Sequence, residues 1–112
     1  MVRKRGVKGK PRDKKRFIVR LMNDSQYYVS IDIAKELNRL DNRLVRILNE
    51  DRPDEDGVRD IIAGMRILVK SNGKRIRDDK MIPSDIIIPV SDISIDEAKG
   101  IFKGEGIIPD IL

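Results

Sequence analysis

The chain has 112 residues, no cysteine, no histidine and a net charge of +5 at pH 7. This length allows one small domain with a modest core. The absent residue types exclude disulfides, thiolate chemistry and cysteine zinc sites, and they remove the commonest metal ligand and general base. No recognisable catalytic constellation remains among the carboxylates, lysines and serines, so we predict a protein that is not an enzyme and that has no cofactor or metal.

Hydropathy and composition bear on where the protein works. Its apolar runs are far shorter than a membrane span, and no apolar stretch follows the basic first residues as in a signal peptide. We therefore expect a cytoplasmic protein without membrane contact. Charged residues make up 38% of the chain and there are 18 isoleucines, a composition that is typical of many thermophile proteins and indicates habitat, not function.

The first sixteen residues form a strongly basic segment. Residues 1–16 contain nine of the 24 lysines and arginines and one of the 19 acids, a net of +8, which leaves residues 17–112 with a net of −3. Gly6, Gly9 and Pro11 break any helix, and the like charges repel one another, so we predict a disordered arm. Lysine and arginine release counterions from nucleic acid, which favours a phosphate-binding arm over a merely solubilising terminus. The predicted binding residues are Arg3, Lys4, Arg5, Lys8, Lys10, Arg12, Lys14, Lys15 and Arg16.

The next segment, residues 17–29, fits two structures. Phe17, Ile18, Leu21 and Met22 have the spacing of one helical face. The β-prone triplets FIV and YYV on either side of a turn-like NDS instead favour a β-hairpin. Both interpretations stay open.

Two short helices with a break between them are predicted for residues 30–48. Ser30 is a suitable N-cap for the first helix, residues 38–40 interrupt it, and Asp41 can cap the second. An acidic loop with Pro53 follows. The predicted inward-facing residues are Ile33, Ala34 and Leu37 in the first helix and Leu44, Val45, Ile47 and Leu48 in the second.

The middle of the chain continues with a further helix and a hairpin. GVRDIIAGM, residues 57–65, places its apolar residues at helical spacing and predicts an additional helix. In MRILVKSNGKRIR, residues 65–77, the pair Asn72-Gly73 favours a type I′ turn between two short strands.

These elements resemble a winged helix domain over about residues 15–78. Helix, short break and helix, with the small Ala34 where the helices would cross, resembles the helix-turn-helix unit, and the hairpin resembles the wing. The pattern departs from the family at Arg39, where an apolar residue is usual, and in the extra segment before the hairpin. The alternative is a small α+β core that uses the two helices as a packing device.

The resemblance implies a DNA-binding protein, in transcription regulation or DNA architecture, whose second helix enters the major groove. The residues that would face the bases are Asn42, Arg43 and Arg46, and those of the hairpin that would contact phosphates are Lys70, Lys74, Arg75 and Arg77.

The last third of the chain has its own signals. Residues 86–88, between two prolines, predict a short buried or edge strand. Ser94 and Glu97 form a capping box at the start of a helix that Gly104 can end. The apolar residues that follow would fold back on the core, or bind a protein partner or a second copy of the chain; they are Ile107, Ile108, Ile111 and Leu112.

Together these patterns predict an α+β fold, a small winged-helix-like domain of three or four helices plus a β-hairpin. The predicted divisions are the arm at 1–16, the core at 17–82 and a C-terminal extension at 83–112. Nucleic acid is the predicted partner. The basic KSNGKRIR segment favours DNA, which ranks first. The acidic body favours a ribosomal-type protein that binds rRNA through its arm, which is similar in style to the basic extensions of ribosomal proteins. An adaptor for protein interactions ranks third.

Overall fold

A β-hairpin opens the part of the chain that the structure describes. Strand β1 (Arg16–Leu21) pairs antiparallel with strand β2 (Gln26–Ser30). Phe17 and every second residue after it in β1 are fully buried, which is the period of a strand. Asn23 in the turn has a φ of 62°, a conformation that asparagine tolerates. Of the two interpretations of this segment, the hairpin is therefore correct and the helix is wrong. The computed structural model describes residues 16–80, 82–102 and 106–108.

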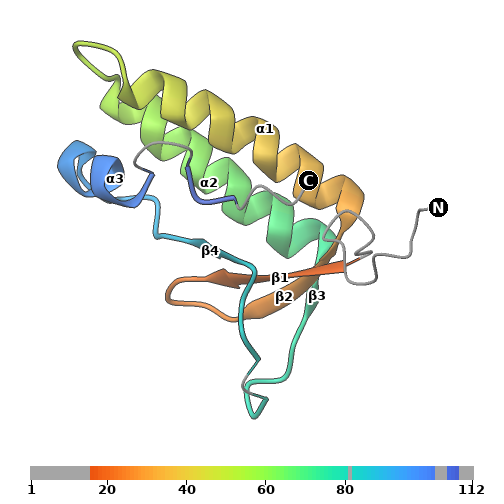
Figure 1. The fold of residues 1–112 in the computed structure, drawn as a ribbon. Coiled ribbons are helices and arrows are strands. Elements are labelled where there is room, and N and C mark those ends of the chain that lie inside the picture. The colour runs from red at the N-terminus through yellow and green to blue at the C-terminus, as the bar shows by residue number, and fades with distance from the viewer. Residues whose placement is uncertain (1–15, 81, 103–105, 109–112) are drawn as a thin grey trace.

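Two further strands complete a mixed sheet. Strand β3 (Lys74–Arg75) pairs antiparallel with β2, and strand β4 (Ile86–Ile88) pairs parallel with β1, so the order is β3-β2-β1-β4. Figure 1 shows that a long excursion of the chain separates β3 from β4. The predicted strand at residues 86–88 is confirmed, and it forms one edge of the sheet.

Helix α1 (Ile31–Leu48) is one continuous helix. The Ser30 side chain accepts a hydrogen bond from the backbone N–H of Ile33, which confirms the predicted N-cap. The predicted break at residues 38–40 is wrong, because the buried face runs through it without a change of period and includes Asp41 in mid-helix. Those buried residues are Ala34, Leu37, Asp41, Leu44 and Leu48.

Helix α2 (Glu55–Asn72) is also longer than predicted, and it replaces the first strand of the expected wing. Its apolar residues keep a helical period as far as Val69, so the helix continues through the segment assigned to a hairpin. Gly73 follows with a φ of −89° and a ψ of 166°, which is extended backbone and not a type I′ turn. Residues 16–80, all described by the structure, contain neither a helix-turn-helix nor a wing, so the winged-helix interpretation is wrong.

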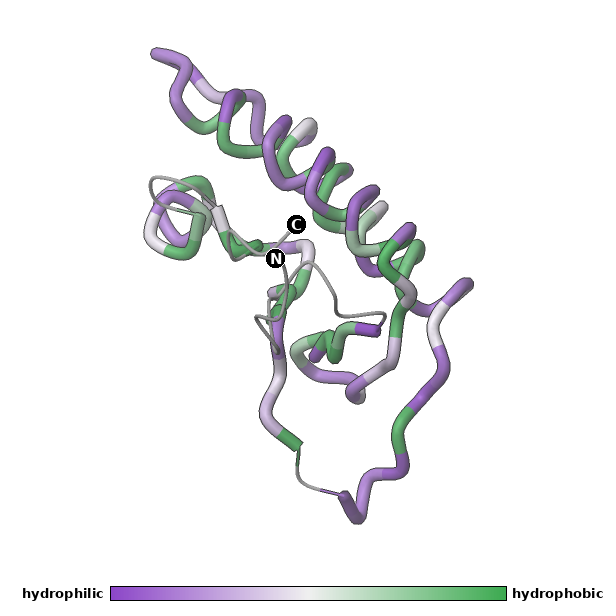
Figure 2. Tube along the Cα trace, turned by 45° about the vertical axis from the view of Figure 1, so that its right-hand side comes forward, coloured by the Kyte–Doolittle hydropathy of each residue, from purple (hydrophilic) through white to green (hydrophobic). Residues whose placement is uncertain are grey.

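The elements form two layers, and the α+β class is confirmed. Helices α1 and α2 lie side by side on one face of the sheet (Figure 1), and their buried residues share one core with Phe17, Val19 and Ile88 of the strands. Both helices alternate between hydrophilic and hydrophobic residues along their length (Figure 2), as expected for helices with one buried face. No helix in the described parts of the chain is long and apolar enough to cross a membrane.

A short third helix, α3 (Ile95–Ile101), follows β4. The backbone N–H of Glu97 donates to the Ser94 hydroxyl, and the Glu97 carboxylate accepts from the Ser94 N–H, so the predicted capping box is confirmed. The predicted stop at Gly104 lies outside the described residues.

Replacing Gly64 with alanine is expected to stabilise the protein by about 0.5–1 kcal/mol, because glycine in a helix interior costs that much relative to alanine. Gly64 lies inside α2, and a Cβ atom there would meet no other atom within 4 Å. Urea denaturation of the variant and the wild type measures the difference. An unchanged or lower stability would show that this part of α2 does not gain from helix propensity.

Candidate functional site

An apolar groove lies beside strand β4 at the edge of the sheet. Its volume is about 440 Å³. Four large apolar side chains are exposed among the described residues, and three of them, Met22, Ile87 and Ile101, line this groove, while the fourth, Ile67, is on α2. Exposed apolar groups that gather in one place usually mark an interaction surface. The described residues that line it are Met22, Ser84, Asp85, Ile87, Pro89, Ile101 and Ile107.

Backbone pairing places the central side chain of the groove. Ile86 and Ile88 are buried, and alternation along β4 therefore turns Ile87 outward, where half of its surface is exposed. At the start of the strand, the Asp85 carboxylate accepts from the backbone N–H of Ile18 at 2.8 Å, and the Asp85 N–H donates to the Ile18 carbonyl at 2.8 Å. The floor of the groove is thus part of the sheet.

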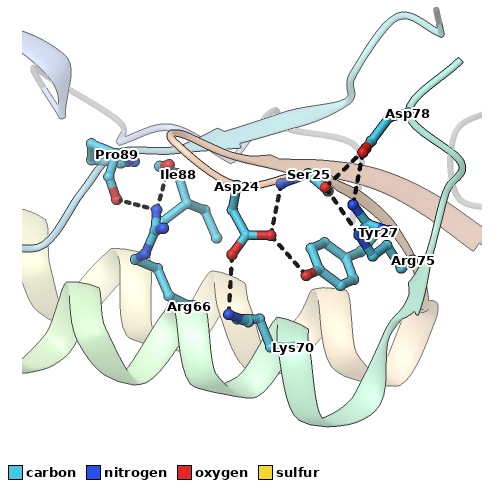
Figure 3. Close-up of polar contacts among 9 residues, drawn as sticks. All are labelled: Asp24, Ser25, Tyr27, Arg66, Lys70, Arg75, Asp78, Ile88 and Pro89. Atoms are coloured by element: carbon cyan, nitrogen blue, oxygen red, sulfur yellow. Dashed lines mark hydrogen bonds and ion pairs between the residues drawn. The ribbon is translucent and has the colours of Figure 1, made fainter. Parts of the chain in front are cut away.

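Helix α2 fixes the other end of β4. The Arg66 guanidinium donates to the carbonyl of Pro89 at 3.0 Å and to that of Ile88 at 3.5 Å (Figure 3). The backbone N–H of Met22 also donates to the Ile88 carbonyl, at 2.9 Å. These bonds fix the backbone of Met22 beside β4 and that of Pro89 at its C-terminal end.

The turn next to Met22 is tied to the same helix. One Asp24 carboxylate oxygen accepts from the Tyr27 hydroxyl at 2.8 Å and from the Ser25 N–H at 2.7 Å, and the other lies 3.0 Å from the Lys70 ammonium (Figure 3). The hydrogen bond from Lys70, with that from Tyr27, holds the pKa of Asp24 below its ordinary value. Burial raises the pKa of Tyr27. This polar cluster makes the hairpin turn a rigid support for the groove.

The remaining wall comes from residues 106–108, held by a buried carboxylate. Asp41 on α1 has no exposed surface, and its two oxygens accept from the backbone N–H groups of Ile107 at 3.2 Å and Ile108 at 3.1 Å. Burial raises the pKa of Asp41, although these two hydrogen bonds act in the opposite direction. Ile107 then lines the groove while Ile108 is buried in the core.

The model of one protein family, described as PspA-associated protein, matches residues 17–110. This chain belongs to the PspA-associated protein family. No curated protein and no solved structure matches the chain. The family is neither a winged-helix nor a ribosomal family, and its name refers to a protein partner. The predictions of a DNA-binding or rRNA-binding function, and of nucleic acid as the partner, were therefore wrong.

The match begins directly after the arm on which the nucleic-acid prediction rested most. Residues 1–16 hold the net charge of +8, whereas the part of the chain that the family model matches starts at residue 17. The predicted arm residues from Arg3 to Lys15 lie outside the described residues. Arg16 begins β1, and its guanidinium lies 4.1 Å from the centre of the Tyr28 ring.

The structure does not bring the other predicted nucleic-acid contacts together on one face of this PspA-associated protein. Asn42, Arg43 and Arg46 are exposed on the side of α1 that faces away from the buried residues. The basic residues expected to bind phosphates lie on other elements, and most of them form ion pairs with carboxylates of the same chain. Lys70 pairs with Asp24, Arg75 with Asp78 and Arg77 with Asp79, while Lys74 lies on the edge strand β3.

Most groove residues of this family member were missed from the sequence. Ile107 was among the residues expected to meet a partner or the core, but Met22, Ile87 and Ile101 were not. The available signal was the run Ile86–Ile88, because in any strand the middle residue faces opposite to its neighbours. Asp41 was interpreted as a helix cap. Its actual role could not be predicted, because a carboxylate that binds a backbone N–H 66 residues away leaves no pattern in the neighbouring sequence.

Proposed function

We propose that this chain acts by binding PspA, as a non-enzymatic protein of the cytoplasm, and that the groove beside β4 is the binding site. The membership of residues 17–110 in the PspA-associated family is the observation that carries the proposal. The groove supplies a suitable surface, because the centres of protein interfaces are apolar and closely packed.

The groove favours binding over catalysis. Among the residues that the structure describes, its lining contains one ionisable side chain, Asp85, and that carboxylate already accepts the backbone N–H of Ile18. A catalytic acid and base would need a second titratable group within hydrogen-bond distance of a substrate. An apolar groove with fixed walls instead suits one or two aliphatic or aromatic side chains of a partner, the type of anchor that dominates protein affinity.

Replacing Ile87 with serine is expected to weaken binding to PspA about tenfold, because the change removes the central apolar contact without adding charge. Calorimetric titration of the full chain with purified PspA from the same organism gives the dissociation constant. Ile67→Ser is the matched control, since Ile67 is even more exposed, at 63%, but lies on α2 outside the groove.

The outcomes separate the two parts of the proposal. Absence of any binding between the wild-type chain and PspA would overturn the function. Binding that Ile67→Ser weakens and Ile87→Ser leaves unchanged would keep the function and move the site to α2. Thermal melts of both variants check that the fold is intact.

A further inference from the structure

The strands of this protein carry positive charge and no negative charge. Strands β1 to β4 contain four basic residues and no aspartate or glutamate. Arg75 is paired with Asp78, but Arg16, Arg20 and Lys74 form no ion pair with any other described residue. What sets these three cations apart is their place on neighbouring strands, where a partner's carboxylates could reach them together.

The three cations lie on the face of the sheet that α1 and α2 leave open. Arg16 and Arg20 alternate with the buried residues of β1, so they face away from the helices. Arg20 is the register partner of Ile87, the central residue of the groove. Lys74 is the register partner of Tyr28, whose ring carries the Arg16 guanidinium.

Two described acids that adjoin the strands in sequence already have hydrogen-bond or ion-pair partners. Asp85 accepts the backbone N–H of Ile18, and Asp79 pairs with Arg77 in the loop after β3. Among the described residues, this sheet face therefore presents an apolar groove with one carboxylate, Asp85, beside three cations that form no ion pair. A surface of this kind is complementary to a segment that is apolar on one side and acidic beside it.

We infer that the groove and the open sheet face together bind an amphipathic segment of PspA that carries carboxylates next to its apolar side chains. This inference rests on the proposed function. The apolar side chains of the segment enter the groove at Ile87, and its carboxylates meet Arg20 and the cations further along the sheet. Charges at the rim of an interface act mainly on the association rate and on its salt dependence.

The test measures the association rate of wild type and variants with PspA, by stopped-flow, over a series of salt concentrations. The double variant Arg20→Gln, Lys74→Gln is expected to associate about tenfold more slowly at low salt and to lose most of the salt dependence. Arg43→Gln is the matched control for Lys74→Gln alone, because each removes one exposed positive charge and Arg43 lies on the far side of α1. It should change the rate less than about twofold.

Each result decides the inference. A wild-type rate that does not depend on salt, or an equal loss in the Arg43→Gln control, would overturn it while the binding of PspA itself stands. Absence of PspA binding would overturn both proposals. A wild-type dimer that Arg20→Gln dissociates in sedimentation would show that a second copy covers this face instead. If the double variant folds poorly, the same measurement is made with Lys74→Gln alone. This change lies on an exposed two-residue edge strand.

Discussion

Replacing Asp41 with alanine is expected to cost about 1–3 kcal/mol of unfolding free energy for each backbone N–H that loses its partner. Two such groups are involved, those of Ile107 and Ile108, and the second is buried. The variant should also lose the wall of the groove that Ile107 forms. Urea denaturation measures the stability, and hydrogen exchange of the two amides shows whether the loss is local. Unchanged protection of both amides would contradict the assigned role.

A substitution at Gly106 tests the same contact between Asp41 and residues 106–108. Its φ is 90°, and a Cβ atom would overlap sterically with the Asp41 carboxylate, so Gly106→Ala should destabilise the attachment as well. Gly100→Ala is the matched control, because a Cβ atom there meets nothing within 4 Å and the residue lies in helix α3.

The contribution of Asp41 should depend on pH in a defined direction. Burial raises its folded pKa, so the folded protein takes up a proton here more readily than the unfolded chain. This contribution is fully present below the ordinary pKa of 3.8 and is lost as the pH rises through the raised folded value. The stability of wild type relative to Asp41→Asn should therefore grow as the pH is lowered from neutral toward 3.8. The opposite slope would show that the hydrogen bonds from Ile107 and Ile108 lower the pKa of Asp41 more than burial raises it.

Replacing Gly73 with valine is the second change with a large expected effect, about 1–3 kcal/mol of destabilisation from overpacking. The reason is steric. A Cβ atom at this position would lie 2.6 Å from the Val69 carbonyl oxygen and 3.1 Å from that of Tyr28. The Gly73 N–H also donates to the Val69 carbonyl and so ends α2.

Thermal unfolding compared with Gly64→Val distinguishes this cause from helix propensity. Both variants gain the same side chain, but only position 73 brings α2 against β2, while position 64 is open. Equal melting temperatures would contradict the close packing. From the sequence alone, valine at position 73 is also expected to destabilise the protein. The reason was wrong, because it assumed a type I′ turn that the chain does not form.

Local signals predicted the parts of the fold that short segments decide. The caps at Ser30 and Ser94 are confirmed because each is a contact within three residues. The strand at residues 86–88 followed from three isoleucines between prolines. The errors arose where tertiary packing favoured a different structure from the one that the local sequence favours. Asn72-Gly73 is a strong turn pair in isolation, but α2 buries Val69 against the core, and the helix therefore continues to Asn72.

The candidate site could not be predicted from spacing, because its residues come together only in the folded chain. Met22, Ile87 and Ile101 belong to a turn, an edge strand and a short helix that are far apart in sequence. The nucleic-acid hypothesis failed for a related reason, because it assumed that residues close in sequence also act together in the folded chain. It grouped Lys70, Arg75 and other basic side chains by their proximity in sequence, whereas in the fold several of them form ion pairs with carboxylates.

The parallel pairing of β4 with β1 has a consequence for the newly made chain. Asp85 bonds to Ile18, 67 residues earlier, so the hairpin and both long helices leave the ribosome before the strand that completes the sheet. Until then, one side of β1 presents open backbone N–H and C=O groups, and a strand of another nascent chain can pair with it. Misassembly through β1 therefore competes with folding for as long as residues 85–88 remain to be synthesised. The closing of this sheet thus waits for its last strand, a kinetic demand that a sheet built only from consecutive hairpins does not have.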